Sequence, residues 1–168
     1  MKTIFLVGMP SSGKSTLGKR LARRLGYRFV DTDKIIVREE GRSINEIFRQ
    51  EGEPYFRDVE SRVLRTIRPE AGLVVATGGG MPCFHGNMEF IRQNGLSIFL
   101  DVPPEALLER MQHHQSDDRP LFRQHDPTLL ESLRAKERER RPVYTQATLR
   151  IEGTTTPDEL IALLAGLL

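Results

Sequence analysis

The residues with the clearest chemical meaning form the stretch GMPSSGKST, which directly follows a short apolar run at residues 4–7. The stretch combines glycines, hydroxyl side chains and a single lysine, so it is a poor candidate for the interior of a helix or a strand. It matches the pattern G-x-x-x-x-G-K-[ST] of phosphate-binding loops, between a predicted strand and a predicted helix. The fixed positions of this pattern are Gly8, Gly13, Lys14 and Ser15.

The pattern predicts that the loop binds the phosphates of a nucleoside triphosphate. Its glycines let successive backbone N–H groups turn inward, and the following helix presents its positive end to the anion. Lys14 would reach the β- and γ-phosphates, and the Ser15 hydroxyl would hold Mg²⁺. The alternative is a chance glycine-rich turn, which the four matched positions and their flanks make the weaker interpretation. The expected nucleotide-binding residues are Gly8, Ser11, Ser12, Gly13, Lys14, Ser15 and Thr16.

Two carboxylates, Asp31 and Asp33, lie where the second predicted strand should end. In open α/β sheets, ligands bind beyond the carboxyl ends of the strands. Residues two apart on an extended segment point the same way, so one carboxylate could steady Mg²⁺ while the other accepts the proton of an attacking hydroxyl. Alternatively, one of them only caps the helix that starts near Lys34. The sequence leaves both interpretations open.

Two further segments carry groups that could line a substrate pocket. Arg57 and Glu60 stand one helical turn apart. Such a pair usually means a solvated helix face, but Glu60 could instead aim Arg57 into a pocket. Gly78, Gly79 and Gly80 follow the third predicted strand. Three glycines lose much backbone entropy on folding, so they indicate close backbone approach to something, although a plain tight loop fits equally well.

Two arginines in the second half of the chain have open roles. Arg119 falls in a polar segment, 112–125, that we expect to be a long loop acting as a lid. An arginine there could reach the transferred phosphate, although most loop arginines do not. Arg140 comes just before Pro142, at the expected end of a charged helix. Because acidic residues interrupt the basic run 136–141, we interpret this run as a solvated face rather than a nucleic-acid patch.

The composition limits the class of protein. A chain of 168 residues suits one domain with its own core. The 25 basic and 23 acidic side chains give a net charge of +2, which is too weak to argue for nucleic acid. Cys83 is the only cysteine, which excludes an internal disulfide and indicates a reducing compartment. The first apolar run is too short for a signal segment or a membrane span. We expect a cytoplasmic monomer.

Short apolar runs alternate with helical patterns along the chain, which indicates a parallel sheet covered by helices. The expected strands are Thr3–Val7, Arg28–Asp31, Leu73–Ala76, Ser97–Leu100 and Thr148–Ile151. Helix starts are indicated by capping residues and first-turn prolines. The expected starts are the capping box of Ser43 and Glu46, Pro104, Pro127 with Asp126 as its cap, and the box of Thr156 and Glu159. The last of these helices should reach Leu168.

Six short segments, taken in order, resemble the motifs of the shikimate kinases, small phosphate-loop kinases of the nucleoside monophosphate kinase-like fold. The resemblance covers nearly the whole chain, from Ile4 to the last helix. Each motif alone is weak, whereas all six in this order and at suitable spacing are specific. The segments are GMPSSGKST, DTD, FRDVE, TGGGMP, RPLF and RRPVY.

The resemblance implies that the protein transfers a phosphoryl group from ATP to the 3-hydroxyl of shikimate, on the pathway to chorismate and the aromatic amino acids. Asp33 would bind the substrate hydroxyls and act as the base. Lys14 would act on the phosphates, and Arg119 would close over them with the lid. Asp31 would help Ser15 to hold Mg²⁺.

Recognition of the substrate, in the same resemblance, depends on two arginines and the glycine run. Arg57 and Arg140 would grip the shikimate carboxylate, since a planar carboxylate suits bidentate guanidinium groups. Glu60 would orient Arg57. The glycines at 78–80 would lie against the ring through backbone groups, and Arg110 would pack against adenine.

The fold that the resemblance implies is a three-layer α/β fold with a mobile lid at about 112–125. Its five-stranded parallel sheet would have the order 2-3-1-4-5. A single domain, 1–168, would include a substrate-binding helical segment at about 32–67. Ser11 stands where family members commonly carry glycine, which makes the loop less permissive of a positive φ. The rival interpretations are a kinase for another metabolite such as gluconate, a GTP-dependent switch, for which no N-K-x-D stretch occurs, and a nucleic-acid-binding protein.

Overall fold

The computed structural model describes residues 1–113, 120–123 and 125–168. Within these residues, five strands form one parallel sheet in the order β2-β3-β1-β4-β5. This confirms the predicted fold class and strand order, and each strand end lies within one residue of its predicted place. The strands are β1 (Ile4–Val7), β2 (Arg28–Asp31), β3 (Leu73–Ala76), β4 (Leu96–Asp101) and β5 (Leu149–Glu152).

The central position of β1 explains why its sequence is uniformly apolar. It pairs with β3 on one side and β4 on the other, and Ile4 aligns with both Val74 and Leu96. All residues of these three strands are buried, as expected for parallel strands that helices cover on both faces. Because the strands run in one direction, their carboxyl ends share one edge, where Asp31 and Asp101 lie.

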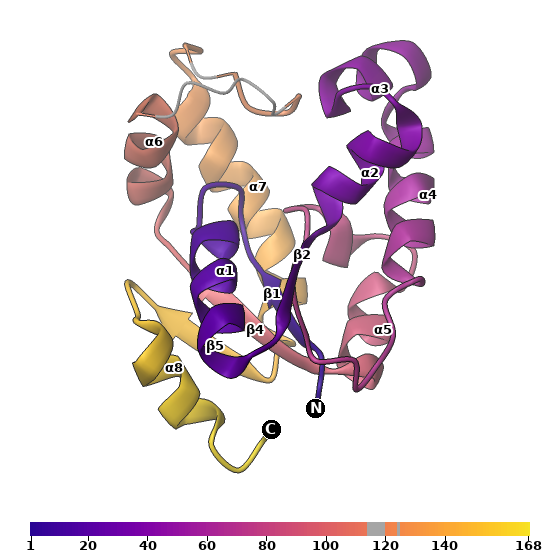
Figure 1. The fold of residues 1–168 in the computed structure, drawn as a ribbon. Helices are drawn as coiled ribbons and strands as arrows, with labels where there is room; N and C mark the ends of the chain where they lie inside the picture. Colours follow the sequence, from indigo (N-terminus) through magenta and orange to yellow (C-terminus); the bar gives the residue numbers. More distant parts are fainter. Residues whose placement is uncertain (114–119, 124) are drawn as a thin grey trace.

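Helices cover both faces of this sheet (Figure 1). No helix of the described residues is both long enough and apolar enough to span a membrane. The helices are α1 (Lys14–Leu25), α2 (Thr32–Glu40), α3 (Ile44–Glu51), α4 (Glu53–Leu64), α5 (Asn87–Asn94), α6 (Pro104–His113), α7 (Leu129–Tyr144) and α8 (Pro157–Leu164), with a 3₁₀ turn η1 (Met81–Cys83).

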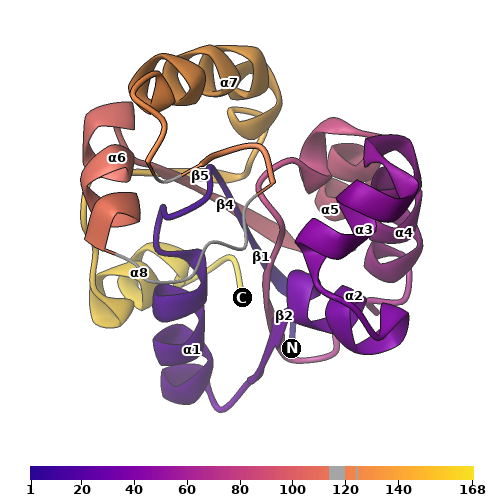
Figure 2. The same ribbon diagram turned by 90° about the horizontal axis from the view of Figure 1, so that it is seen from above.

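Alternation along β1 divides the core into two main clusters. Phe5 and Val7 pack with residues of α4, α5, α6 and α7. Ile4 and Leu6 point to the opposite face and pack with residues of α1 and α8. A third cluster joins α2, α3 and α4 to one another. Seen from above, α2, α3 and α4 are grouped on one side of the molecule and α6 and α7 on the other (Figure 2).

Three of the expected helix starts are confirmed. The Ser43 side chain accepts a hydrogen bond from the backbone N–H of Glu46 at 3.1 Å, before α3. Helix α6 begins at Pro104. At α8 the full capping box is present, since Thr156 and Glu159 exchange side chain–backbone hydrogen bonds. These starts were predictable because side-chain caps and first-turn prolines act locally.

The expected start at Pro127 is wrong, because α7 begins at Leu129. Asp126 does not cap the helix itself. Its carboxylate accepts hydrogen bonds from the backbone N–H and the hydroxyl of Thr128, at 2.8 and 2.7 Å. The helix therefore begins after this Asx turn and not at the proline.

Two other helix ends also differ from expectation. Helix α7 continues through Pro142 to Tyr144, so Arg140 lies inside the helix and not at its end. Tyr144 is completely buried, and its packing holds the last turn despite the proline. The last helix ends at Leu164 instead of Leu168, because Ala165 leaves the helical conformation.

The expected polar loop at 112–125 is partly helical and partly apolar. Helix α6 extends to His113, and Phe122 is buried in the first core cluster. Residues 114–119 and 124 lie outside the described residues. The apolar pair of Leu121 and Phe122 was the sequence signal that this segment contacts the core.

Candidate functional site

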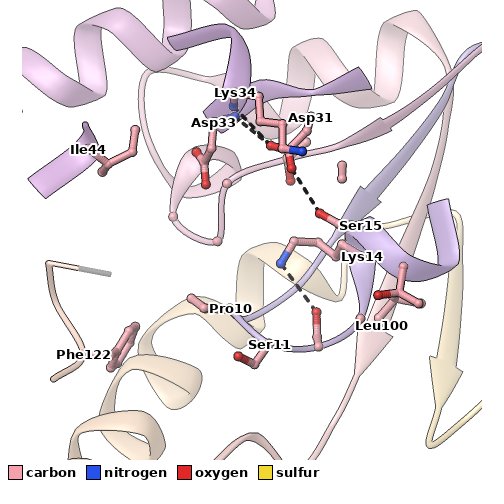
Figure 3. Close-up of a pocket in the computed structure, with 18 of the residues that line it drawn as sticks. Pro10, Ser11, Lys14, Ser15, Asp31, Asp33, Lys34, Ile44, Leu100 and Phe122 are labelled. Carbon is pink, nitrogen blue, oxygen red and sulfur yellow. Dashed lines mark hydrogen bonds between the residues drawn. The ribbon is translucent and has the colours of Figure 1, made fainter. Parts of the chain in front are cut away.

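A cleft of about 930 Å³ opens at the carboxyl edge of the sheet, between the phosphate loop, the starts of α1 and α2, and helices α4, α6 and α7 (Figure 3). Nearly all the predicted site residues line it. These are Ser11, Ser12, Gly13, Lys14, Ser15, Thr16, Asp31, Asp33, Arg57, Glu60, Gly78, Gly79, Gly80, Arg110 and Arg140. Gly8 directly follows β1 and does not line the cleft. Arg119 lies outside the described residues.

The phosphate loop wraps around the amino group of Lys14. Gly13 precedes α1 with a positive φ of 95°, a conformation that glycine adopts readily. Lys14 then begins the helix, and its Nζ donates hydrogen bonds to the carbonyls of Gly8 at 2.7 Å and Met9 at 2.8 Å. The loop thus places one ammonium group and a helix N-terminus at the same point, which is a site for anionic phosphate.

Ser11 adopts the left-handed conformation, with φ 64°, that a glycine would adopt with less strain. Its hydroxyl oxygen is buried and has no hydrogen-bond partner among the described residues. Its carbonyl accepts a hydrogen bond from Nη1 of Arg110 at 3.1 Å. Helix α6 therefore contacts the phosphate loop at Ser11.

Asp31 caps α2, which was one of the two interpretations that the sequence left open, and it also contacts the phosphate loop. One carboxylate oxygen caps α2 by accepting from the N–H groups of Asp33 at 3.0 Å and Lys34 at 3.4 Å. The other oxygen accepts a hydrogen bond from the Ser15 hydroxyl at 3.1 Å (Figure 3). A hydroxyl and a carboxylate next to phosphate oxygens are suitable ligands for Mg²⁺, which keeps several of its waters. No group of three or more His, Cys, Asp or Glu side chains among the described residues forms a metal site.

Arg57 and Glu60 form a buried ion pair, so the interpretation as a solvated helix face is wrong. They are 4% and 1% exposed, and Nη1 of Arg57 lies 2.7 Å from the Glu60 carboxylate. Nε and Nη2 of Arg57 donate to Glu53 at 3.1 and 3.0 Å. The guanidinium also lies 4.3 Å from the centre of the Phe84 ring. These contacts fix the guanidinium at the wall of the cleft.

The Glu60 carboxyl is an unusual acid in this setting. Burial raises its pKa to about 7, and the nearby charge of Asp33 acts in the same direction. Arg57 and Arg140 oppose this shift without cancelling it. A titratable group with such a raised pKa, placed in a cleft beside arginines, is typical of a functional site.

The glycine run lies where no side chain fits, which favours close approach over a plain loop. A Cβ built on Gly78 would lie 2.7 Å from Oε2 of Glu60 and 2.9 Å from Oδ1 of Asp33. A Cβ on Gly80 would lie 2.5 Å from Nη1 of Arg57. The absence of side chains therefore lets two carboxylates and a guanidinium converge on the same backbone.

Arg140 is a buried cation, and not all of its guanidinium nitrogens have a hydrogen-bond partner among the described residues. It is 4% exposed, and its Nη1 has no hydrogen-bond partner among the described residues. The adjacent Arg141 instead binds Asp101 at 2.7 Å and Glu137 at 2.5 Å. The run 136–141 is therefore not one solvated face. An unpartnered guanidinium N–H at the wall of a cleft favours an anionic ligand, because leaving it unpaired is costly.

Sequence reasoning missed an apolar part of the cleft wall. Ile44 and Phe48 from α3 line it together with Phe56 from α4 and Phe122. The spacing of Ile44 and Phe48, four residues apart on a helix, could have indicated a shared face. Nothing in the sequence showed that this face borders a ligand cleft and not only the core.

Comparisons with known proteins agree with this geometry. The family model described as shikimate kinase matches residues 10–164. A shikimate kinase of Persephonella marina is 44% identical over 90% of this chain and 88% of its own length. One of a Sulfurihydrogenibium species is 42% identical over 96% and 94%. The solved structure of a shikimate kinase from Acinetobacter baumannii in complex with shikimate has a TM-score of 0.91 and 34% identity, over 99% of this chain and 94% of that one.

These likenesses extend across the sheet, the phosphate loop and the helices that carry Arg57 and Arg140. They are therefore not limited to a motif that many nucleotide-binding proteins share. The family match runs from the phosphate loop to the end of α8. We conclude that the chain belongs to the shikimate kinase family.

Proposed function

We propose that the protein catalyses transfer of the γ-phosphoryl group of ATP to the 3-hydroxyl of shikimate, giving shikimate 3-phosphate and ADP on the pathway to chorismate. The observation that carries this proposal is the joining of a phosphate loop and two buried arginines in one cleft, where Nη1 of Arg140 has no partner among the described residues. Shikimate offers that cleft a carboxylate and three hydroxyls. The relative solved with shikimate supports the choice of substrate.

At the nucleotide end, we assign the phosphates to Lys14 and to the backbone N–H groups that lead into α1. Ser15 and Asp31 would hold Mg²⁺, whose charge would offset that of the phosphate oxygens. The 3.1 Å hydrogen bond between the two side chains supports this assignment. Arg110 is assigned to adenine, and its bond to the Ser11 carbonyl keeps it at the loop.

At the centre of the cleft, we assign Asp33 as the general base. Its backbone is fixed by the cap of α2, and its carboxylate lies beside the position of Gly78. The 3-hydroxyl oxygen would form a bond to the γ-phosphorus as the bond to the leaving ADP oxygen breaks. The hydroxyl proton would pass to Asp33. Phosphoryl transfer of this kind depends mainly on positioning and on charge stabilisation, which the surrounding cations supply.

At the acid end, Arg57 and Arg140 are assigned to the substrate carboxylate. A guanidinium binds a carboxylate through two parallel hydrogen bonds, and each arginine here enters from a different helix. Glu60 would orient Arg57 through its 2.7 Å bond. The backbone of residues 78–80 would lie against the substrate ring, with no side chain in the way.

We also propose a lid arginine, a monomeric state and a cytoplasmic location. Arg119, in a lid at about 112–125, would close over the phosphates and exclude water, which would suppress hydrolysis of ATP. The protein would act as a monomer. It would work in the cytoplasm, where a single free cysteine stays reduced.

The test is a turnover screen of the purified protein with ATP and Mg²⁺ against shikimate, gluconate and the nucleoside monophosphates. We expect ADP release to be stimulated by shikimate alone and to require Mg²⁺. Replacing ATP with GTP in the same assay checks the nucleotide. Stimulation by gluconate with no response to shikimate would overturn the proposal, because the phosphate acceptor would then be a different hydroxy acid.

A further inference from the structure

Tyr144 has a polar group that none of the assigned roles uses. It is the last residue of α7, it is completely buried, and its ring packs against Phe99 with centroids 5.1 Å apart. It stands four residues after Arg140, so the two side chains share one face of the helix. Burial raises the pKa of the Tyr144 hydroxyl, which therefore stays protonated and able to donate.

The hydroxyl lies where the two ends of the cleft meet. It donates a hydrogen bond to the backbone carbonyl of Gly79 and lies 3.8 Å from Sδ of Met9 in the phosphate loop. Gly79 is confined on its other sides as well. A Cβ built there would lie 2.7 Å from Cδ of Pro10 and 3.2 Å from Nη1 of Arg140. The Gly79 peptide is therefore held between the phosphate loop and α7.

The bond to Tyr144 fixes the direction of a whole peptide unit. The carbonyl of Gly79 and the N–H of Gly80 belong to one planar trans peptide, so they point in opposite directions. Glycine has no side chain to restrict its backbone dihedral angles, so this peptide could otherwise turn with little steric resistance. A donor from the core at the carbonyl therefore also sets where the N–H of Gly80 points.

We propose that Tyr144 is a positioning residue for the acid substrate, because its hydroxyl orients the Gly79–Gly80 peptide that borders Arg57 and Arg140. This inference rests on the proposed function of the same cleft. The effect should be confined to the acid end of the cleft. The Tyr144 hydroxyl donates to backbone at that end and makes only a weak sulfur contact to the phosphate loop. The loss of the hydroxyl should therefore affect the acid substrate and spare the nucleotide.

The experiment compares Tyr144→Phe with Thr3→Val in steady-state assays of shikimate and ATP. Phenylalanine keeps the ring that packs against Phe99 and removes only the hydroxyl. Thr3 is also completely buried, and its hydroxyl donates to the Arg68 carbonyl at 2.8 Å, beside the start of β1 at the opposite edge of the sheet. Thr3→Val therefore removes a comparable hydrogen bond that is remote from the cleft.

We expect Tyr144→Phe to raise the KM for shikimate by about threefold to tenfold, the usual effect of one lost hydrogen bond. Its KM for ATP should stay within about twofold of the wild-type value. Thr3→Val should lower the melting temperature and leave both KM values unchanged. A Tyr144→Phe protein with the wild-type KM for shikimate, or with equal increases for both substrates, overturns the inference.

A second measurement uses the wild-type protein, so it does not depend on how well a variant folds. Shikimate should slow amide hydrogen exchange at Gly79 and Gly80, and unchanged exchange at both residues overturns the inference. Wild-type turnover keeps the two proposals distinct. If wild type does not phosphorylate shikimate, the proposed function fails. If it does and Tyr144→Phe keeps its KM, only the role of Tyr144 fails.

Discussion

The two ends of the cleft are built in different ways. The phosphate end comes from one continuous segment, residues 8–16, and it relies on backbone geometry, a helix N-terminus and one lysine. The acid end is assembled from α2, α4, the glycine run and α7, which are far apart in the sequence. Three of its charged side chains, Arg57, Glu60 and Arg140, are buried.

This difference follows from the ligand that each end is assigned. A polyphosphate carries several charges and can be bound by many weak donors, which a turn and a helix start provide together. A single planar carboxylate needs donors at fixed angles, and Arg57 and Arg140 supply them only because the fold holds them. Buried ion pairs are costly to form, so the acid end depends on the whole structure more than the phosphate end does.

Lys14→Ala should have the largest effect and should separate the two ends. The variant removes the only side-chain cation assigned to the phosphate end among the described residues. We expect kcat/KM to fall by about 10³-fold or more, as for other losses of charge stabilisation in phosphoryl transfer. Calorimetry should show shikimate binding within about threefold of wild type, because the acid end is untouched.

The matched control is Lys19→Ala, which removes an exposed lysine from the same helix. It should retain full activity. If Lys14→Ala lost shikimate binding as severely as turnover, the division of the cleft into two independently built ends would be incorrect.

Asp33→Asn should come next, since it changes the chemical step and leaves the phosphate loop and the two arginines in place. Asparagine keeps the shape of the side chain but cannot accept the hydroxyl proton. We expect kcat to fall by about 10²- to 10³-fold, the usual contribution of a general base, with ATP affinity retained. Asp158→Asn, at an exposed position on α8, is the control. Substantial turnover by Asp33→Asn would remove the base assignment.

The contrast between the two ends also explains what the sequence could predict. The phosphate loop, the strands and the helix caps at Ser43 and Thr156 were predictable, because each depends on neighbouring residues or on regular alternation. The order of the strands came from the resemblance to the shikimate kinases. Arg57 and Glu60 were found by their spacing, but the choice between a solvated face and a pocket depends on burial. Burial is set by α3, η1 and the glycine run, which a local pattern does not show.

The incorrect predictions have similar causes. Pro127 was expected to start a helix, but an Asx turn at Asp126 competes with a cap, and both use the same residue types. Phe122 was included in a polar loop because its partners lie in the core. The closing role of Arg119, the contact of Arg110 with adenine, the single-domain extent and the mobility of the lid stay predictions.

Arg57→Lys tests the acid end, and we expect its effect on activity to be smaller than those of Lys14→Ala and Asp33→Asn. Lysine keeps the charge but loses the planar fork that bonds to Glu53 and Glu60. We expect the KM for shikimate to rise by about 10- to 100-fold, while the KM for ATP changes less than about threefold. Arg62→Lys, at an exposed position on the same helix, should leave both unchanged. Equal increases in the two KM values would count against a carboxylate site at Arg57.

Glu60→Gln should change the pH dependence of stability and is the mildest of these variants. Burial raises the pKa of Glu60 to about 7 in the folded protein, from a value of 4.5 for an ordinary glutamate. Between these values the folded protein holds a proton that the unfolded chain releases. The stabilisation from this proton is complete below about pH 4.5 and is lost as the pH rises towards 7.

Glutamine at position 60 does not titrate, so it removes this dependence. The quantity to compare is the free energy of unfolding of wild type minus that of Glu60→Gln, measured by urea denaturation. We expect this difference to fall by about 1 to 3 kcal/mol between pH 5 and pH 8. Glu109→Gln, at an exposed position on α6, is the control for replacing a glutamate with a glutamine. A wild-type advantage that grows with pH would mean that the charge of Arg57 outweighs burial. The acid end would then hold a conventional ion pair. The two ends would differ only in that one comes from a continuous segment and the other from elements far apart in the sequence.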